Sequence, residues 1–165
     1  MADFEVVGMS ASDALAWRIA LGFKEEVVDV SSADLQSLFT SPKLLVPAPG
    51  VGKFILPFWT KVDYLFGTTA YTGTGDNGVF RSWILYDDIE VPTGTDISAM
   101  RRVFAQTESA ITYSPADLFA SDVFVFRALA ENKSVVLKSE GDYADGDGIA
   151  QVTICYRIEN LLTNA

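Results

Sequence analysis

Ala150-Gln-Val-Thr-Ile-Cys-Tyr-Arg-Ile158 is the stretch of the chain whose pattern decides the fold class. Apolar residues stand at every second position, and mainly polar residues stand between them. Because successive side chains of a strand point to opposite faces of a sheet, this alternation predicts a half-buried antiparallel strand. One face of this strand should therefore line the core.

Other stretches rich in apolar, β-branched and aromatic residues predict further strands along the chain. These stretches are residues 25–30, 53–62, 79–86, 110–113, 123–129 and 135–138. Pro57 cannot donate to a central ladder, so it marks a strand end, an edge or a bulge. Residues 68–78, with three glycines, predict a loop, and residues 141–148 predict a tight polar loop. Many short strands with Gly and Pro turns predict a mainly-β protein, an antiparallel β-sandwich with the jelly roll as the preferred variant.

The first 22 residues have a different, helical pattern. Ser10 followed by Asp13 resembles a capping box, with Asp in place of the usual Glu, and Gly22 is a natural helix stop. We therefore expect two parts, an N-terminal arm with a short helix over residues 1–24 and a β-sandwich domain over residues 25–165.

Two further short helical segments are predicted inside the sandwich. Residues 32–39 begin with a capping residue, carry an apolar group at Leu35, Leu38 and Phe39, and must end before Pro42. Ser114-Pro-Ala-Asp117 resembles a capped helical turn with proline at its first position.

Composition excludes several classes of function. The chain has 165 residues, of which 49% are apolar and 21% charged, and its net charge is −10. A nucleic-acid binder would show a basic patch, and an anionic membrane surface would repel this charge, so neither partner is expected. The chain has no histidine, which removes Ser-His-Asp and Cys-His catalysis and most zinc sites. The single cysteine, Cys155, cannot form an internal disulfide and indicates a reducing compartment.

Four acidic residues crowd one loop: Glu140, Asp142, Asp145 and Asp147. Neither possible register places oxygen ligands at the alternating positions of a calcium loop, and no closing glutamate follows. Asp and Gly supply the backbone angles of tight turns, so a solvated hairpin turn is favoured over a metal site.

Three other motifs predict no chemistry. The adjacent carboxylates Asp87 and Asp88 would point to opposite sides of a strand, whereas a glycosidase needs two that face each other, so they are expected to end a strand. Gly50-Val-Gly-Lys53 has too short a spacing for a phosphate-binding loop. Cys155 has no basic partner in its motif and is expected to be inert. We therefore expect no catalytic residue, no metal and no cofactor.

The aromatic residues are the remaining candidates for binding. Core packing explains most of the 11 Phe, 6 Tyr and 3 Trp. Trp17 and Phe23, beside the predicted arm helix, are the candidates for partner contact, and a core role is an equal alternative. Tyr71, with Asp76 and Asn77 in the loop at residues 68–78, is the candidate for stacking against a sugar.

The order of motifs resembles small structural proteins of tailed bacteriophage virions. The most specific stretch is Leu45-Val-Pro-Ala-Pro-Gly-Val-Gly-Lys53, and three others follow it. These are Phe66-Gly-Thr-Thr-Ala-Tyr-Thr-Gly-Thr-Gly75, Glu131-Asn-Lys-Ser-Val-Val-Leu-Lys138 and Asp145-Gly-Asp-Gly-Ile-Ala-Gln-Val-Thr-Ile-Cys-Tyr-Arg-Ile158. The resemblance covers roughly residues 27 to 160.

This resemblance implies a jelly-roll or β-sandwich module without enzymatic activity. It implies a capsid decoration or cement protein, made in the bacterial host cytoplasm, that binds the major capsid protein on the capsid exterior, as a homotrimer. A tail- or fibre-associated module that binds a host surface glycan is the alternative. A hydrolase, using Asp87 or Asp88 with one acid of residues 140–147, ranks last.

Overall fold

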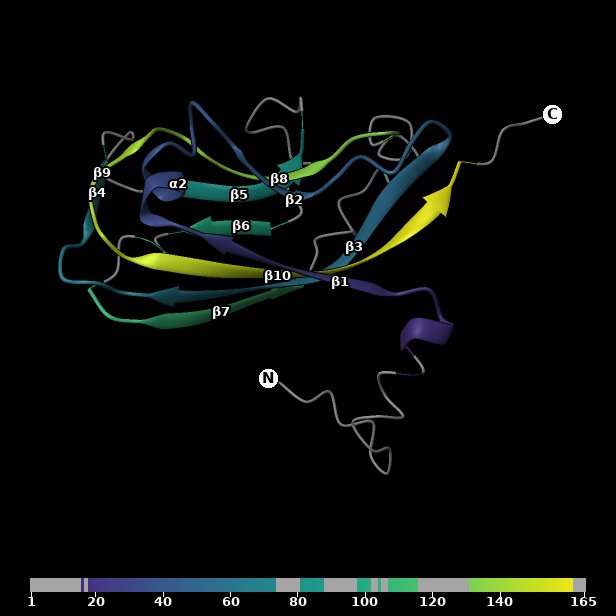
Figure 1. Cartoon of the computed structure of the whole chain (residues 1–165), viewed down its shortest axis with the longest axis horizontal. Coiled ribbons are helices and arrows are strands. Elements are labelled where there is room, and N and C mark those ends of the chain that lie inside the picture. Colours follow the sequence, from purple (N-terminus) through teal and green to yellow (C-terminus); the bar gives the residue numbers. More distant parts are fainter. Residues whose placement is uncertain are drawn as a thin grey trace.

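A computed structural model describes residues 16, 18–73, 81–87, 98–101, 104, 107–115 and 131–161. Over these residues the chain is mainly β, as predicted, with antiparallel strands and two short helical segments (Figure 1). The elements are β1 (Lys24–Val30), α2 (Ser32–Gln36), β2 (Lys43–Val46), β3 (Lys53–Leu65), β4 (Tyr71–Gly73), β5 (Arg81–Tyr86), β6 (Ser98–Arg101), β7 (Ala110–Pro115), β8 (Val135–Ser139), β9 (Tyr143–Asp145) and β10 (Ile149–Asn160).

The strands form two four-stranded antiparallel sheets and one short pair. The first sheet has the order β1-β10-β3-β7, and the second sheet has the order β2-β8-β5-β6. When the eight strands of these sheets are numbered along the chain, the orders are 1-8-3-6 and 2-7-4-5. Consecutive strands therefore change sheet at almost every step. β4 pairs with β9 at one end of the two layers, far from the N-terminal helical turn (Figure 1).

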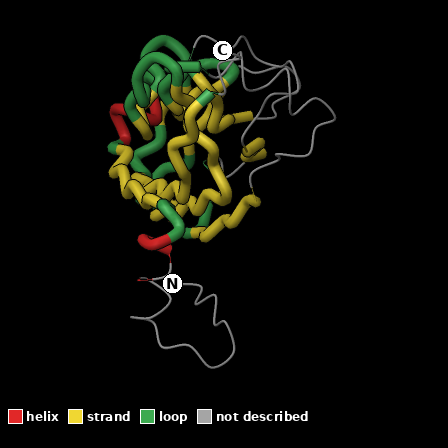
Figure 2. Tube along the Cα trace, turned by 90° about the vertical axis from the view of Figure 1, so that its right-hand side faces the viewer, coloured by secondary structure: helices red, strands yellow, loops and turns green. Residues whose placement is uncertain are grey.

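The two sheets face each other across one hydrophobic core. Val152 and Ile154 of β10 have no exposed surface, and Leu137 of the second sheet meets the same core from the other side. The Tyr86 hydroxyl of the second sheet donates a 2.5 Å hydrogen bond to the carbonyl oxygen of Ile55 in the first. The alternation in residues 150–158 therefore predicts the inward face correctly. Figure 2 shows the strands from the side, with the N-terminal helical turn below them.

A bulge interrupts β3 at the predicted proline. Cys155 pairs with Trp59 and the next residue, Tyr156, pairs with Pro57, so Phe58 is an extra residue on β3. Pro57 lacks the N–H that a regular ladder would use, and a bulge is where that loss is tolerated. The expectation for Pro57 is thus confirmed.

The helical turn before β1 ends as the sequence predicts. The Gly22 N–H donates to the Ile19 carbonyl at 3.0 Å, the Phe23 N–H donates to the Arg18 carbonyl at 2.9 Å, and Gly22 has a φ of 78°. This pattern is a Schellman motif, which requires the left-handed conformation that glycine adopts most easily. The predicted cap at Ser10 and Asp13 lies outside the described residues.

Some predicted elements differ from the structure. Ser114 and Pro115 continue β7 instead of starting a helical turn, because both pair with β3. The two predicted loops at residues 68–78 and 141–148 each contain a short strand, β4 and β9, and among the described strands these two pair only with each other. The predicted strand at residues 123–129 lies outside the described residues. No helix among the described residues is long and apolar enough to cross a membrane.

Candidate functional site

Tyr71 lies in the core, so it is not the exposed sugar-stacking residue that the sequence predicts. Its side chain is 2% exposed, and its hydroxyl donates a 2.6 Å hydrogen bond to the carbonyl oxygen of Gly148. Its ring packs edge-on against Tyr143, with 5.8 Å between the ring centroids. Burial raises the pKa of Tyr71 to about 12. The loop motif could not reveal this, because the pairing of β4 with β9 joins residues about 70 positions apart.

Asp147 binds the loop that precedes β4. One carboxylate oxygen accepts hydrogen bonds from the backbone N–H groups of Thr68 and Thr69, both at 2.8 Å, and the other accepts from the Thr68 hydroxyl at 2.7 Å. These bonds, led by the one from the Thr68 side chain, lower the pKa of Asp147. The carboxylate therefore stays ionised and holds two loops together.

The other acids of the same loop bind other segments. One Asp142 oxygen accepts from the backbone N–H groups of Phe39 and Thr40 at 3.0 and 3.1 Å, and Asp145 accepts from the Thr72 hydroxyl at 3.1 Å. No group of three potential metal ligands occurs among the described residues. The loop is therefore more than the simple solvated turn that the sequence suggests, because Asp142 and Asp147 each hold the backbone of another segment and Asp145 binds the Thr72 side chain.

Close packing of glycines completes this end of the molecule. A Cβ on Gly148 would lie 2.5 Å from the Tyr64 hydroxyl, and a Cβ on Gly146 would overlap the Tyr71 ring. The Gln36 side chain donates to the Gly146 carbonyl at 3.0 Å, which ties α2 to the same loop. Real Cβ atoms do not approach this closely, so only glycine fits without a shift.

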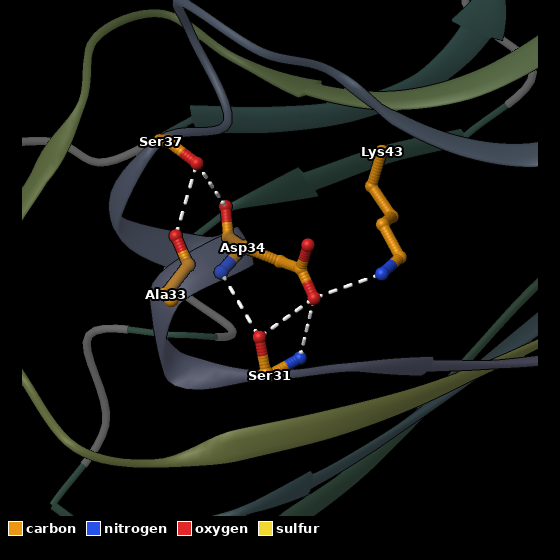
Figure 3. Close-up of polar contacts among 5 residues, drawn as sticks. All are labelled: Ser31, Ala33, Asp34, Ser37 and Lys43. Atoms are coloured by element: carbon orange, nitrogen blue, oxygen red, sulfur yellow. Dashed lines mark hydrogen bonds and ion pairs between the residues drawn. The ribbon is translucent and has the colours of Figure 1, made fainter.

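The polar residues at the start of α2 also bind other groups of this chain (Figure 3). The Ser31 hydroxyl accepts from the Asp34 N–H at 3.2 Å, and the Asp34 carboxylate accepts from the Ser31 N–H at 2.9 Å, which is a reciprocal capping box. The same carboxylate binds Lys43 Nζ at 2.8 Å. Burial raises the pKa of Asp34, but hydrogen bonds from Lys43 and Ser31 outweigh it and lower the pKa overall. Phe39, predicted to join the apolar face of this helix, is 50% exposed because α2 ends at Gln36.

Two backbone donors of the Gly50–Lys53 loop, those of Gly50 and Gly52, are bound by side chains of this chain. The Gly50 N–H donates to Asn132 Oδ1 at 3.0 Å, the Gly52 N–H donates to Glu131 Oε1 at 2.8 Å, and the Asn132 N–H returns a 2.8 Å bond to the Lys53 carbonyl. A phosphate would have to displace these partners. The loop is therefore a junction between two segments and not a phosphate cradle.

These contacts join, in pairs, the four motifs that carry the resemblance. The 45–53 motif binds the 131–138 motif through Glu131 and Asn132, and the 66–75 motif binds the 145–158 motif through Asp147. Each junction connects segments 77 to 82 positions apart in the chain. The motifs therefore close loops of the sandwich.

Two remaining residues have contacts that match their expected structural roles. The Ser134 hydroxyl donates to Asp87 at 3.1 Å just after β5 ends at Tyr86, whereas Asp88 lies outside the described residues. Cys155 is 4% exposed, and burial, helped by the charge of Glu25, raises the pKa of its thiol. A raised pKa favours the protonated thiol, which is the less reactive form.

Phe23 is half-buried between the N-terminal turn and the first sheet. Its ring packs edge-on against Phe58, with 4.6 Å between the centroids, and the Arg157 guanidinium lies 6.0 Å from its centre. Phe58 is the bulged residue of β3, so the bulge turns its side chain toward Phe23. Phe23 therefore anchors this turn to the sandwich, while Trp17 lies outside the described residues.

The outer face of the first sheet carries an apolar patch that the sequence reading did not single out. We call it the β7 margin: Ile111 and Tyr113 of β7, Leu65 of β3 and Ile149 of β10. Their exposed fractions are 63%, 48%, 58% and 48%. Asp63 pairs with Ile111, Lys61 pairs with Tyr113, and Leu65 pairs with Ile149, which places all four on one face. The strand parity was available in the sequence, but which strands lie side by side, and so which exposed residues gather in one patch, was not.

Comparison with protein-family models and with curated proteins finds no match to this chain. The arguments for function below therefore depend on the geometry and on the motifs.

Proposed function

We propose that this protein is a structural component of a tailed-bacteriophage virion that decorates the outside of the capsid and stabilises the shell. Its proposed partner is the major capsid protein, and it is proposed to act as an oligomer, a homotrimer by the resemblance. It would be made in the cytoplasm of the bacterial host. Its role is adhesion and not catalysis.

The observation that carries this proposal is the mutual closure of the four resemblance motifs. These motifs carry the resemblance to virion proteins, and in the fold they bind one another instead of framing an open site. The strand order 1-8-3-6 against 2-7-4-5 supports the jelly roll that the resemblance implies. A net charge of −10 also favours an external surface over a DNA-lined interior.

The glycan-binding alternative loses its stacking residue. Tyr71 is buried and hydrogen-bonded inside the sandwich, so it offers no ring face to a sugar. The hydrolase alternative also weakens, since Asp142 binds the segment after α2, and Asp145 and Asp147 both bind the 66–75 motif.

The test is the amount of this protein in purified virions. Quantitative gels should give a copy number in fixed proportion to the major capsid protein, and stripped particles should rebind the purified protein to the same ratio. A few copies per particle would place the protein in the tail, and absence from particles would overturn the proposal.

The N-terminal segment is proposed to grip the capsid protein or a neighbouring subunit. Removal of residues 1–22 should abolish binding to stripped capsids and leave the melting temperature of the sandwich unchanged. Removal of residues 162–165 at the other end is the matched control. Full occupancy by the protein lacking residues 1–22 would contradict this assignment.

A further inference from the structure

The outer face of the first sheet offers a surface for a specific partner. We propose that the β7 margin is the surface on which a second copy of this chain docks. This inference rests on the proposed function, because it assigns a place to the self-association that the proposed oligomer requires. The argument uses the edge chemistry, the apolar area and the charge of the margin.

β7 is an edge strand without the charges that usually protect an edge. It pairs with β3 on one side, and no other described strand pairs with it. None of its six residues is charged, whereas the edge strand β1 carries four charged residues among seven, and β2 and β6 each carry one. Charged residues on edge strands prevent pairing with other chains. Of the four edge strands β1, β2, β6 and β7, only β7 carries no charged residue.

The apolar area of the margin suits the centre of an interface. Its four side chains, each about half exposed, present roughly 300–400 Å² of apolar surface, in the range of the largest patch on a monomer, which is often functional. A standard interface buries about 800 Å² on each partner. The margin would supply the apolar centre, and neighbouring polar residues would supply the rim.

The charges beside the margin are already paired. Lys61 Nζ binds Asp63 Oδ2 at 2.5 Å and lies 5.9 Å from the centre of the Tyr113 ring. This pairing raises the pKa of Lys61. A second copy also carries a charge of −10, so most of the acidic surface would repel it. A neutral apolar margin is where a second acidic chain can approach with the least repulsion, whereas a basic partner would be drawn to the acidic surface elsewhere on the molecule.

The first test compares self-association of surface variants. Sedimentation equilibrium of the full chain should show concentration-dependent association, and Ile111→Lys and Leu65→Lys should each weaken it at least tenfold. Val27→Lys is the matched control, because Val27 lies on the same outer face at the opposite edge and is 51% exposed. Thermal unfolding should confirm that all three variants fold. A monomeric wild-type chain, or equal association of all three variants, would overturn the proposal.

A labelling experiment tests the same surface without adding charge. Cys155 is buried, so a cysteine introduced at the surface should be the reactive thiol. Labelling of Ile111→Cys by a maleimide should slow as the protein concentration rises, while labelling of Val27→Cys should stay constant. Constant labelling at both positions would contradict docking at the β7 margin. The copy number in particles tests the proposed function separately. A chain that is abundant in particles but does not associate through the β7 margin would overturn only the docking surface, and a chain that associates through the margin but is absent from particles would overturn only the proposed function.

Discussion

The substitution Tyr71→Phe tests whether the Tyr71 hydroxyl is buried in the core, because it removes the hydroxyl and keeps the ring. That hydroxyl donates a 2.6 Å hydrogen bond to the buried carbonyl oxygen of Gly148. A buried acceptor left without its donor costs about 1–3 kcal/mol, and we expect a loss near 2 kcal/mol because phenylalanine still fills the site. For a chain of this size, about 2 kcal/mol lowers the melting temperature by about 4–8 °C.

The assay is urea unfolding with Tyr113→Phe as the matched control. Tyr113 is 48% exposed on β7, so loss of its hydroxyl should change stability by no more than about 0.5 kcal/mol. The midpoint for Tyr71→Phe should fall while the dependence on urea stays the same, which indicates an unchanged fold. Equal stability of the two variants would refute the reasoning, because it would mean that the Tyr71 hydroxyl faces water.

Three further predictions concern the packing and titration of the same end of the sandwich. Gly148→Ala would place a Cβ 2.5 Å from a buried tyrosine hydroxyl and should cost about 1–3 kcal/mol in urea unfolding, whereas Gly141→Ala, which meets nothing within 4 Å, should not. Burial raises the pKa of Tyr71 and Tyr143 to about 12. The stability that these two buried tyrosines contribute should be fully present below about pH 10, where unfolded tyrosine begins to ionise, and should be lost as the pH rises toward 12. Alkaline unfolding followed by circular dichroism measures this, and a stability that does not change over this pH range would contradict it. Because the pKa of Asp147 is lower in the folded chain, its carboxylate stabilises the fold at pH values above its unfolded pKa, and this stability is lost as the pH falls through its folded pKa. Asp147→Asn should therefore melt at a lower temperature at neutral pH, and its stability should depend less on pH in the acid range. An unchanged dependence on pH would count against the loop-closing role.

Much of the strand pattern could be predicted from the sequence because it is local. The alternation at residues 150–158 and the positions of Pro57 and Gly22 depend on side-chain direction and backbone angles over a few residues, and all three match the structure. The short strands β4 and β9 were missed because three residues carry little periodicity.

The roles of single residues in the candidate sites were harder to predict. Tyr71 in a glycine-rich loop suggested exposure, yet pairing with a strand about 70 residues away buries it. Asp147 suggested a solvated turn, yet its partners belong to the loop before β4. Such contacts depend on which segments meet, and this is a property of the whole chain.

The sequence by itself determined the mainly-β class, the acidic charge and the absence of histidine chemistry, because these follow from composition and from the period of side chains along one strand. The tertiary structure alone decided that the four distinctive motifs bind one another, that Tyr71 belongs to the core and that Ile111 and Leu65 share one exposed margin. The physical reason is that burial and hydrogen bonding depend on contacts between segments distant in the chain. The sequence contains both partners of each contact but does not show which segments pack together.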